Sequence, residues 1–538
     1  MKTSATFIAA IVAALCAAPG AFAHDGDATP LAPKPPDELG KVHFPTSCDP
    51  AVEQQFDRAM ALLHSFWAKD AIAGFNTVLR QDPGCAIAYW GIAVAHQQNP
   101  LTAQQPASPA AKEALAGLDK AKAIGAKTRR ERDYLATIEL IYRDADKTDF
   151  RSRRLAYEKA MEDLAQRYPD DPEASIFYAL ALQMTVLLTD KTYANQLKSA
   201  AILERLARDQ PEHPGIVHYL VHAYDYPSIA ERGLPAARLY ARIAPNHPHA
   251  LHMPSHIYTR LGMWQDSIDN NRRSAAAARA EGNGQEQAHA MDYLVHAHLQ
   301  MGQDAEAERL VSEVDSIVGI NPEIFIGPYG TAAMPARYVL ERRAWKEAIA
   351  LRPHATKFLF PDAITHFARG LGFAHTGDVA AAKEEESSLE KIRNQLAARN
   401  VTYWADQVQV QRLAVAGWIA LAQGNRDAAL ESMRASADLE DSMEKHIVTP
   451  SPVVPARELL GDMLLEVDRP AEALQAYEAS AQREPNRLRG LYGAARAAAR
   501  SGDREKARAY YAKLVTLTEK SDGSRPELQQ ARAYLARR

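Results

Sequence analysis

A period of 34 residues constrains what this chain can fold into. In the C-terminal part, Ala473 and Tyr477 recur as Ala507 and Tyr511, each 34 residues later. From Pro50 onward nearly every segment carries apolar residues at helical spacing, and Pro, Gly, Asn or Asp breaks it at short intervals. A period of this length is typical of a helix pair that buries its apolar face only by stacking on its neighbours. The sequence therefore predicts an all-α chain of stacked helix pairs.

The repeating units resemble the tetratricopeptide repeat (TPR) superfamily. They have small residues where two helices cross, an aromatic residue four positions later and a closing proline, as at Ala71, Phe75 and Pro83. The resemblance covers most of residues 50–517, with irregular insertions around residues 99–151 and 185–197. It implies a right-handed superhelical solenoid of TPR-like helix-turn-helix repeats, in which the first helix of each unit lines a concave groove that binds ligands.

The opening segments ALLHSFW and DPGCAIAYWG also resemble a group of exported bacterial TPR proteins whose activity is not established. A repeat motif of this kind specifies the fold strongly and the function weakly. The resemblance therefore implies a scaffold and no particular reaction.

The N-terminus is typical of a secretory signal peptide. One lysine precedes an apolar run over residues 7–18, and Ala-Phe-Ala at residues 21–23 predicts cleavage after Ala23. The mature protein is then expected to be periplasmic or secreted, with no membrane insertion. The chain is divided into a signal peptide (1–23), a flexible leader (24–49), N-terminal repeats with irregular insertions (50–200), central histidine-rich repeats (201–345) and C-terminal repeats (346–538).

Charge and cysteine content limit the partners. The formal net charge is only -4, so no basic footprint for nucleic acid is present. Cys48 and Cys85 remain after the predicted cleavage, at equivalent ends of neighbouring helices. Export would permit a disulfide between them, which we expect to hold the N-terminal repeats together. The alternative is two buried thiols.

Histidine is concentrated in the central repeats. Residues 213–298 contain ten of the 18 histidines, whereas residues 97–212 contain none. HPGIVHYLVHAYD and HPHALHMPSHIYTR each place two histidines four residues apart, and the two pairs are 34 residues apart. A third copy follows after 37 residues. Aligning the copies gives three columns: His218, His252 and His289; His222, His256 and Tyr293; and Asp225, Thr259 and His296.

The columns are expected to run along one groove. Residues at positions 0, +4 and +7 share a face of an α-helix, and in this superfamily that face of the first helix binds ligands. In the following unit, Ala333 and Arg337 stand where His252 and His256 stand in the earlier one. The repeat architecture therefore does not require histidine, which favours a local site.

Paired imidazoles in this pattern suit a transition metal. Two histidines at i and i+4 can share one ion, and a third can come from the neighbouring helix. No thiolate lies in the region, so zinc, copper or iron is expected. The predicted ligands are His218, His222, His252, His256, His289 and His296. Further groove candidates are Asp225, His213, His247, His249, Tyr293, Glu286, Arg260 and Arg337.

Two alternatives to metal binding stay open. The groove would bind an acidic peptide or a small anion through partly protonated histidines, Arg260 and Arg337, as a non-enzymatic adaptor. Alternatively, the histidines pack between crowded helices. An open position on a bound metal would allow activation of water or dioxygen, but the sequence has no phosphate loop, nucleophile elbow or H-E-x-x-H motif. Whether the protein is an enzyme is therefore undecided at this level.

Overall fold

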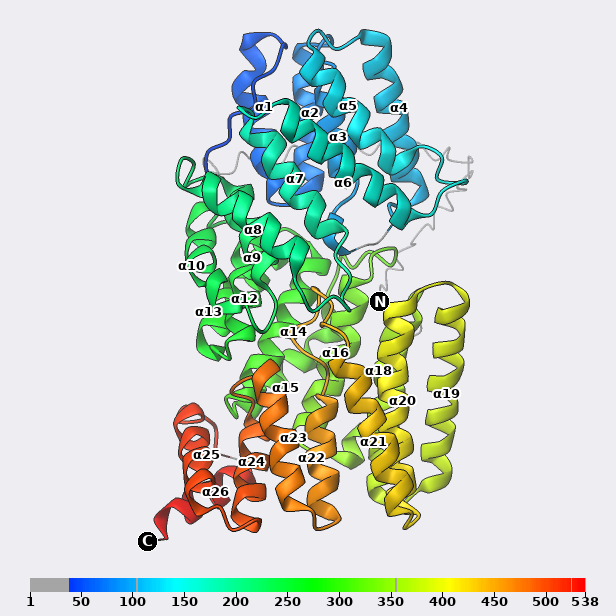
Figure 1. The fold of residues 1–538 in the computed structure, drawn as a ribbon, viewed down its shortest axis with the longest axis vertical. Helices are drawn as coiled ribbons and strands as arrows, with labels where there is room; N and C mark the ends of the chain where they lie inside the picture. The colour runs from blue at the N-terminus through cyan, green and yellow to red at the C-terminus, as the bar shows by residue number, and fades with distance from the viewer. Residues whose placement is uncertain (1–37, 103–104, 354–355, 524, 538) are drawn as a thin grey trace, which may run out of the picture. The chain divides into compact units, whose positions relative to one another are not determined.

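The amphipathic segments of the sequence fold into α-helices that follow one another as antiparallel pairs (Figure 1). This computed structural model describes residues 38–102, 105–353, 356–523 and 525–537, and no β-strand occurs among them. The all-α prediction is therefore confirmed. The predicted signal peptide and residues 24–37 of the predicted leader lie outside the described residues.

The helices fall into three consecutive groups. The N-terminal group is α1 (Glu53–His64), α2 (Ala68–Gln81), α3 (Ala88–Ala95), α4 (Ser108–Ile124), α5 (Arg129–Tyr142), α6 (Phe150–Arg167), α7 (Pro172–Met184) and α8 (Ala194–Ala207). The central group is α9 (Pro214–Tyr224), α10 (Leu234–Ile243), α11 (Pro248–His252), α12 (Pro254–Arg260), α13 (Trp264–Ala280), α14 (Gly284–Gln300), α15 (Asp304–Ser312), α16 (Ile326–Glu341) and α17 (Trp345–Ala350). The C-terminal group is α18 (Leu359–Thr376), α19 (Val379–Ala398), α20 (Thr402–Ala422), α21 (Arg426–Asp441), α22 (Ala456–Glu466), α23 (Pro470–Arg483), α24 (Leu488–Arg500), α25 (Arg504–Leu517) and α26 (Pro526–Ala536).

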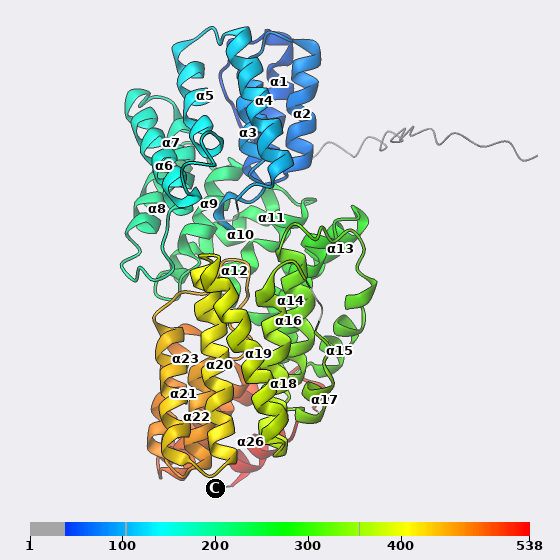
Figure 2. The same cartoon turned by 90° about the vertical axis from the view of Figure 1, so that its right-hand side faces the viewer.

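Each helix packs on the next and often on the one after it, as α14 does on α13 and α16, and α20 on α18 and α21 (Figure 2). The aromatic ring of each repeat packs against the following helix, at a position where only a small residue leaves room for it. A side-chain carbon added to Gly91 would lie 2.4 Å from the Phe75 ring, and one added to Gly493 would lie 2.2 Å from the Tyr477 ring. Glycine lets the ring enter the helix crossing, and the result is a TPR-like solenoid.

The packed part of the chain begins before the first helix. Residues 38–49, which the leader prediction includes, form no helix, but Leu39 and Phe44 are buried. The Phe44 ring stacks on Trp90 with ring centroids 5.4 Å apart. Cys48 and Cys85 form a disulfide, which joins this segment to the loop before α3.

Three inner elements of the central repeats carry the histidines: α9, the α11 and α12 pair, and α14. Pro254 lacks an N–H group and follows Met253, and the chain is divided there into α11 and α12. Met253 keeps right-handed helical backbone angles at the break. His252 and His256 therefore still point to the same side.

A long loop from the C-terminal repeats returns to these inner helices. We call residues 442–455, between α21 and α22, the 442–455 loop; it runs beside α14 and α16 in Figure 1. Its Glu444 N–H donates to Leu188 at 2.6 Å, and the Tyr293 hydroxyl donates to Thr449 at 3.2 Å. Residues far apart in the sequence thus meet in the central repeats.

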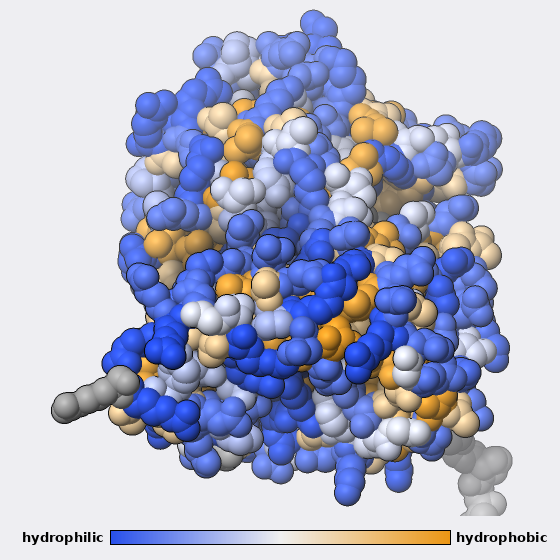
Figure 3. All heavy atoms as spheres, turned by 60° about the horizontal axis from the view of Figure 1, so that its bottom comes forward, coloured by the Kyte–Doolittle hydropathy of each residue, from blue (hydrophilic) through white to orange (hydrophobic). Residues whose placement is uncertain are grey.

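The surface seen in Figure 3 is mainly hydrophilic, with hydrophobic residues in small groups between hydrophilic ones. Such scattered groups are ordinary on a surface in contact with water. Among the described residues, none of the helices combines the length and the apolar character needed to cross a bilayer.

Candidate metal centre

Two groups of three buried histidines lie in the central repeats. Trio A consists of His218 and His222 from α9 and His249 from α11. In each trio one ring nitrogen per histidine lies within 4.8 Å of the other two. Three imidazole nitrogens this close can bind one metal ion.

Trio B consists of His252 from α11, His256 from α12 and His289 from α14. It borders trio A, because the rings of His222 and His256 have centroids 5.7 Å apart. Five of the six histidines predicted as ligands therefore fall in the two trios. Trio A draws on two helices and trio B on three.

The hydrogen bonds of trio B fix which nitrogens carry protons. Nδ1 of His252 donates to the amide oxygen of Asn271 at 2.6 Å, and that amide is oriented by its own bond to the Ser267 carbonyl at 2.8 Å. Nδ1 of His256 donates to the carboxylate of Asp225 at 2.9 Å. In neutral rings both Nε2 atoms are then free of hydrogen, yet they lie 3.0 Å apart.

Trio A repeats this arrangement. Nδ1 of His218 donates to the backbone carbonyl of His64 at 2.7 Å, and Nδ1 of His249 lies 3.4 Å from the carboxylate of Glu286. Their Nε2 atoms face each other at 3.2 Å. His222 completes the trio, and neither of its buried ring nitrogens has a hydrogen-bond partner among the described residues.

Two lone pairs that face each other at this distance repel unless a cation lies between them. Two nitrogens bound to one tetrahedral metal ion at bond lengths of about 2.0–2.1 Å lie about 3.3 Å apart. The observed separations of 3.0 and 3.2 Å are close to that value. An Nδ1 hydrogen held by a carboxylate or carbonyl is also the usual arrangement of a metal-binding histidine.

Burial disfavours a proton as the cation between the facing Nε2 atoms. Burial and the neighbouring histidines lower the pKa of His218 and of His252 well below the ordinary value. Burial also lowers the pKa of His289 to about 3. Neutral imidazole is the form that binds metals, so these histidines are in a form that could hold an ion.

Asp225 organises the side of trio B next to α9. Its carboxylate accepts from Arg260 at 2.8 Å and from Lys445 at 3.1 Å, in addition to His256. Burial opposes the charge of Asp225, but Lys445 and Arg260 hold its pKa well below the usual range. Burial and Arg260 lower the pKa of Lys445 to about 8. The ionised carboxylate keeps the proton of His256 on Nδ1.

Tyr293 and Glu286 border the trios. The ring of Tyr293 packs edge-on against His252, with centroids 4.6 Å apart, and its hydroxyl donates to Thr449. Burial opposes the charge of Glu286, but His249 lowers the pKa of this carboxyl to about 2. Glu286 therefore accepts the Nδ1 proton of His249.

His296, the sixth predicted ligand, belongs to neither trio. It lies on α14, and its ring packs edge-on against Trp264 with centroids 5.2 Å apart. Both of its ring nitrogens are buried without a hydrogen-bond partner among the described residues. His249, predicted only as a further groove residue, stands in trio A instead.

His213 belongs to a third group, together with His64 and Glu173. Nε2 of His213 and Nε2 of His64 lie 3.0 and 2.9 Å from the two oxygens of Glu173. The other nitrogen of His213 accepts from the backbone of Ile216, and that of His64 lies 3.1 Å from the Tyr219 hydroxyl. Every ring nitrogen here has a partner, so this group is a hydrogen-bonded network, unlike trios A and B.

The remaining predicted groove residues have structural contacts. His247 caps α11 by accepting from the backbone N–H of His249, and its ring packs on Trp67. Arg337 donates to Asp292 at 2.8 Å and to the Ser451 carbonyl of the 442–455 loop at 2.9 Å. Neither side chain is part of a trio.

Sequence reasoning missed Lys445 and Asn271. Lys445 lies 220 residues from Asp225 in the sequence, and Asn271 lies on α13, outside the histidine columns. The Asn271 side chain is buried between α13 and α11. A polar residue on the buried face of the second helix of a repeat would have been the sequence signal for it. No local signal marks Lys445.

Acidification is expected to destabilise the metal-free protein steeply. In the unfolded chain histidine titrates near 6.5, whereas burial lowers the folded pKa of His218, His252 and His289. The unfolded state therefore takes up protons first, and the free energy of unfolding falls as the pH drops below 6.5. The loss is about 1.4 kcal/mol per pH unit for each such histidine. Urea unfolding in the presence of a chelator between about pH 7.5 and 5 measures it, and a midpoint independent of pH would contradict the burial of neutral histidines.

Comparisons with known proteins add little to this site. No protein family and no curated protein matches the sequence. Among solved structures, a human IFIT1 dimer with PPP-AAAA aligns over 80% of this chain and 90% of its own, at 12% identity and a TM-score of 0.40. The human IFIT1 dimer with m7Gppp-AAAA aligns over the same shares at 12% identity and a TM-score of 0.37. A likeness at TM-scores this low carries no argument about this chain, and the TPR-like fold is shown by its own helix pairs.

Proposed function

We propose that the protein binds two transition-metal ions, one at trio A and one at trio B, with zinc, copper or iron as the candidates. The observation that carries this proposal is the pair of facing Nε2 contacts, at 3.0 and 3.2 Å. In each contact the two Nδ1 atoms are committed to acceptors, so neutral rings point two lone pairs at each other.

The donor set narrows the metal. Three imidazole nitrogens without a thiolate suit zinc, copper and iron better than calcium or magnesium, which prefer oxygen. Three protein ligands leave a coordination position open, and an ion bound in this way activates water or dioxygen. In trio B, Asp225 orients His256, and the Tyr293 ring covers His252. We assign metal binding to the trios and no reaction.

The contacts of the 442–455 loop support this function over a peptide-binding adaptor. Arg260 and Arg337, the cations expected to hold an acidic peptide, are both buried and are paired with Asp225 and Asp292. Arg337 also donates to Ser451 of the 442–455 loop. The protein's own chain thus takes the bonds that a peptide would need.

We further propose that the protein is exported, to the periplasm or out of the cell. The signal-peptide pattern of the first 23 residues predicts this. The disulfide between Cys48 and Cys85 supports it, because disulfides form and persist in oxidising compartments.

Metal content tests the proposed function. The protein, purified without a histidine tag and dialysed against zinc, copper(I) or iron(II), is expected to retain two ions per chain by elemental analysis. Less than a tenth of an equivalent, with no uptake of any of the three metals, would overturn the proposal. His298→Ala is the matched control, because Nδ1 of His298 is bonded to Gln303 at 2.6 Å and the residue lies outside both trios. This variant is expected to retain both ions.

A further inference from the structure

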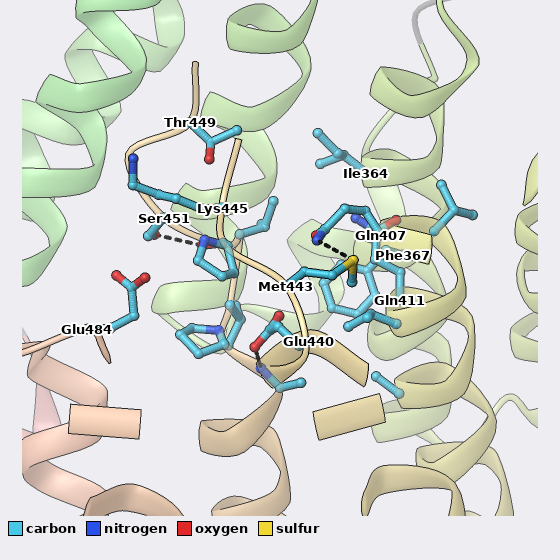
Figure 4. Close-up of a pocket in the computed structure, with 18 of the residues that line it drawn as sticks. Ile364, Phe367, Gln407, Gln411, Glu440, Met443, Lys445, Thr449, Ser451 and Glu484 are labelled. Atoms are coloured by element: carbon cyan, nitrogen blue, oxygen red, sulfur yellow. Dashed lines mark hydrogen bonds between the residues drawn. The ribbon is translucent and has the colours of Figure 1, made fainter. Parts of the chain in front are cut away.

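A second site lies on the other face of the 442–455 loop. It is a pocket of about 970 Å³, its open mouth included, between that loop, α16, α18, α20 and the ends of α21 and α23 (Figure 4). Lys445 and Thr449 line the pocket and also bond to Asp225 and Tyr293 beside trio B.

One wall of the pocket is aromatic. Phe360 and Trp404 stack with ring centroids 3.9 Å apart and an interplanar angle of 3°. Tyr403 and Tyr329 pack against Trp404 with centroids 5.1 and 5.7 Å away. All four rings line the pocket. Aromatic faces bind apolar groups and also attract organic cations.

Polar and charged groups gather on separate sides. Figure 4 shows Phe367, Gln407 and Met443 together on one side, with Glu440 beside Met443 and Glu484 on the opposite side. The basic residues that line the pocket already have acidic partners: Lys445 is paired with Asp225, Arg457 with Asp441 and Arg483 with Glu444. They leave no free cation for an anionic ligand.

Two carboxyl groups in the pocket lack such a partner. Glu440 and Glu484 form no ion pair with any residue that the structure describes, and Glu484 is only 8% exposed. Glu440 accepts one bond, from the backbone N–H of Ala456 at 2.7 Å, and the side chain of Glu484 accepts none from the described residues. The buried hydroxyl of Ser480, also in the pocket, has no hydrogen-bond partner among them either. The charges of Arg260, Arg487 and Lys445 act on Glu484 without forming an ion pair, and burial still raises the pKa of this carboxyl. The chemistry that the described residues do not supply here is therefore a cation that donates a hydrogen bond.

We propose that this pocket binds a small organic amine in its ammonium form. The ammonium group pairs with Glu440 and Glu484, and its apolar or aromatic body packs on Trp404 and Phe360. The combination of an aromatic wall and unpaired carboxylates is how proteins select organic cations over metal ions and over neutral molecules of the same shape. None of the trio histidines lines this pocket.

The pH dependence of binding follows from Glu440. Burial raises the pKa of Glu440 to about 8. Asp441 and Glu484 contribute to this shift, and the Ala456 N–H and Arg483 oppose it. Below that pH the carboxyl is largely neutral and cannot pair with an ammonium group. Affinity for an amine is therefore expected to increase as the pH rises from about 6 to about 8, and this increase is expected to disappear in Glu440→Gln.

Calorimetric titration with three matched probes tests the proposal. Phenethylamine is the cation, 2-phenylethanol the neutral analogue and 3-phenylpropionate the anion, each added to the intact protein at about pH 8. Phenethylamine is expected to bind one per chain, at least tenfold more tightly than the alcohol, and the anion is expected not to bind. Equal or tighter binding of the anion, or no binding of any probe, would overturn the proposal.

Variants locate the site. Glu440→Gln and Glu484→Gln are each expected to weaken phenethylamine binding at least tenfold. Glu431→Gln, which changes an exposed glutamate on α21, is expected to leave it unchanged. Circular dichroism of each variant verifies the fold, and if Glu440→Gln does not fold, Glu484→Gln and the pH profile still decide. Wild-type affinity in both pocket variants would place the amine elsewhere and refute this site.

Discussion

Replacing His252 and His256 together by alanine is expected to remove one bound metal ion and to leave the other in place. Both histidines belong to trio B, and His289 alone cannot hold an ion against dialysis. Trio A keeps all three of its ligands and the Glu286 carboxylate that orients His249. The metal content measured by elemental analysis is therefore expected to fall from two ions per chain to one, and the helical circular dichroism signal is expected to stay unchanged.

The reciprocal variant and a control make this result specific. His218→Ala with His222→Ala is expected to remove the ion of trio A and to spare that of trio B. His296→Ala is expected to retain both ions, although the spacing of the sequence suggested His296 as a ligand, because its ring packs on Trp264. Unfolding of the His252 and His256 double variant with no change in metal content would instead assign these histidines a structural role.

Removing the Asp225 carboxylate is expected to produce the largest loss of stability. Asp225→Ala leaves the guanidinium of Arg260 and the ammonium of Lys445 buried without their common partner. Breaking a buried ion pair in this way costs about 3–5 kcal/mol. Urea unfolding of the metal-free variant measures the cost. Trio B is also expected to lose affinity for its ion by about 10–100-fold, because the carboxylate that orients His256 is then missing.

A second substitution tests whether the uncompensated buried charges cause this loss of stability. Lys445→Met in the Asp225→Ala background removes one uncompensated charge and is expected to recover part of the lost free energy of unfolding. It is not expected to restore metal affinity, because the orienting carboxylate is still missing. If Asp225→Ala lowers the free energy of unfolding by less than about 1 kcal/mol, the charges of Arg260 and Lys445 are hydrated. Their ion pairs with Asp225 then contribute little to stability.

The fold was predictable from the sequence because its determinants are local and periodic. The 34-residue spacing of Tyr477 and Tyr511 reflects one helix pair, and Gly493 sits where the Tyr477 ring needs room. The two i, i+4 histidine pairs also followed from helix geometry, and each pair stayed within one trio. Contacts within a helix thus needed no tertiary information.

The grouping of the histidines was not predictable, because it depends on how neighbouring helices are staggered. Periodicity placed His218, His252 and His289 in one column, but the structure pairs His218 with His249 and places His289 with His252. His249 lies one turn before His252 and reaches across to α9. Seven residues beyond His289 on α14, His296 faces Trp264 instead of the trios.

The 442–455 loop was also beyond sequence reasoning. Lys445 meets Asp225 across 220 residues, and the Tyr293 hydroxyl meets Thr449 across 156 residues. The loop sequence is rich in proline and carries no periodic pattern. Such contacts arise only when the C-terminal repeats are folded against the central ones.

Anomalous diffraction from crystals of the metal-loaded protein, recorded on both sides of the absorption edge of the metal, tests the two trios most directly. Two anomalous peaks are expected, each about 2.0–2.1 Å from the ring nitrogens of one trio. One belongs to His252, His256 and His289, and the other to His218, His222 and His249. Metal-loaded crystals with no peak at either trio, or with peaks only at surface residues, would contradict the assignment of these histidines as ligands.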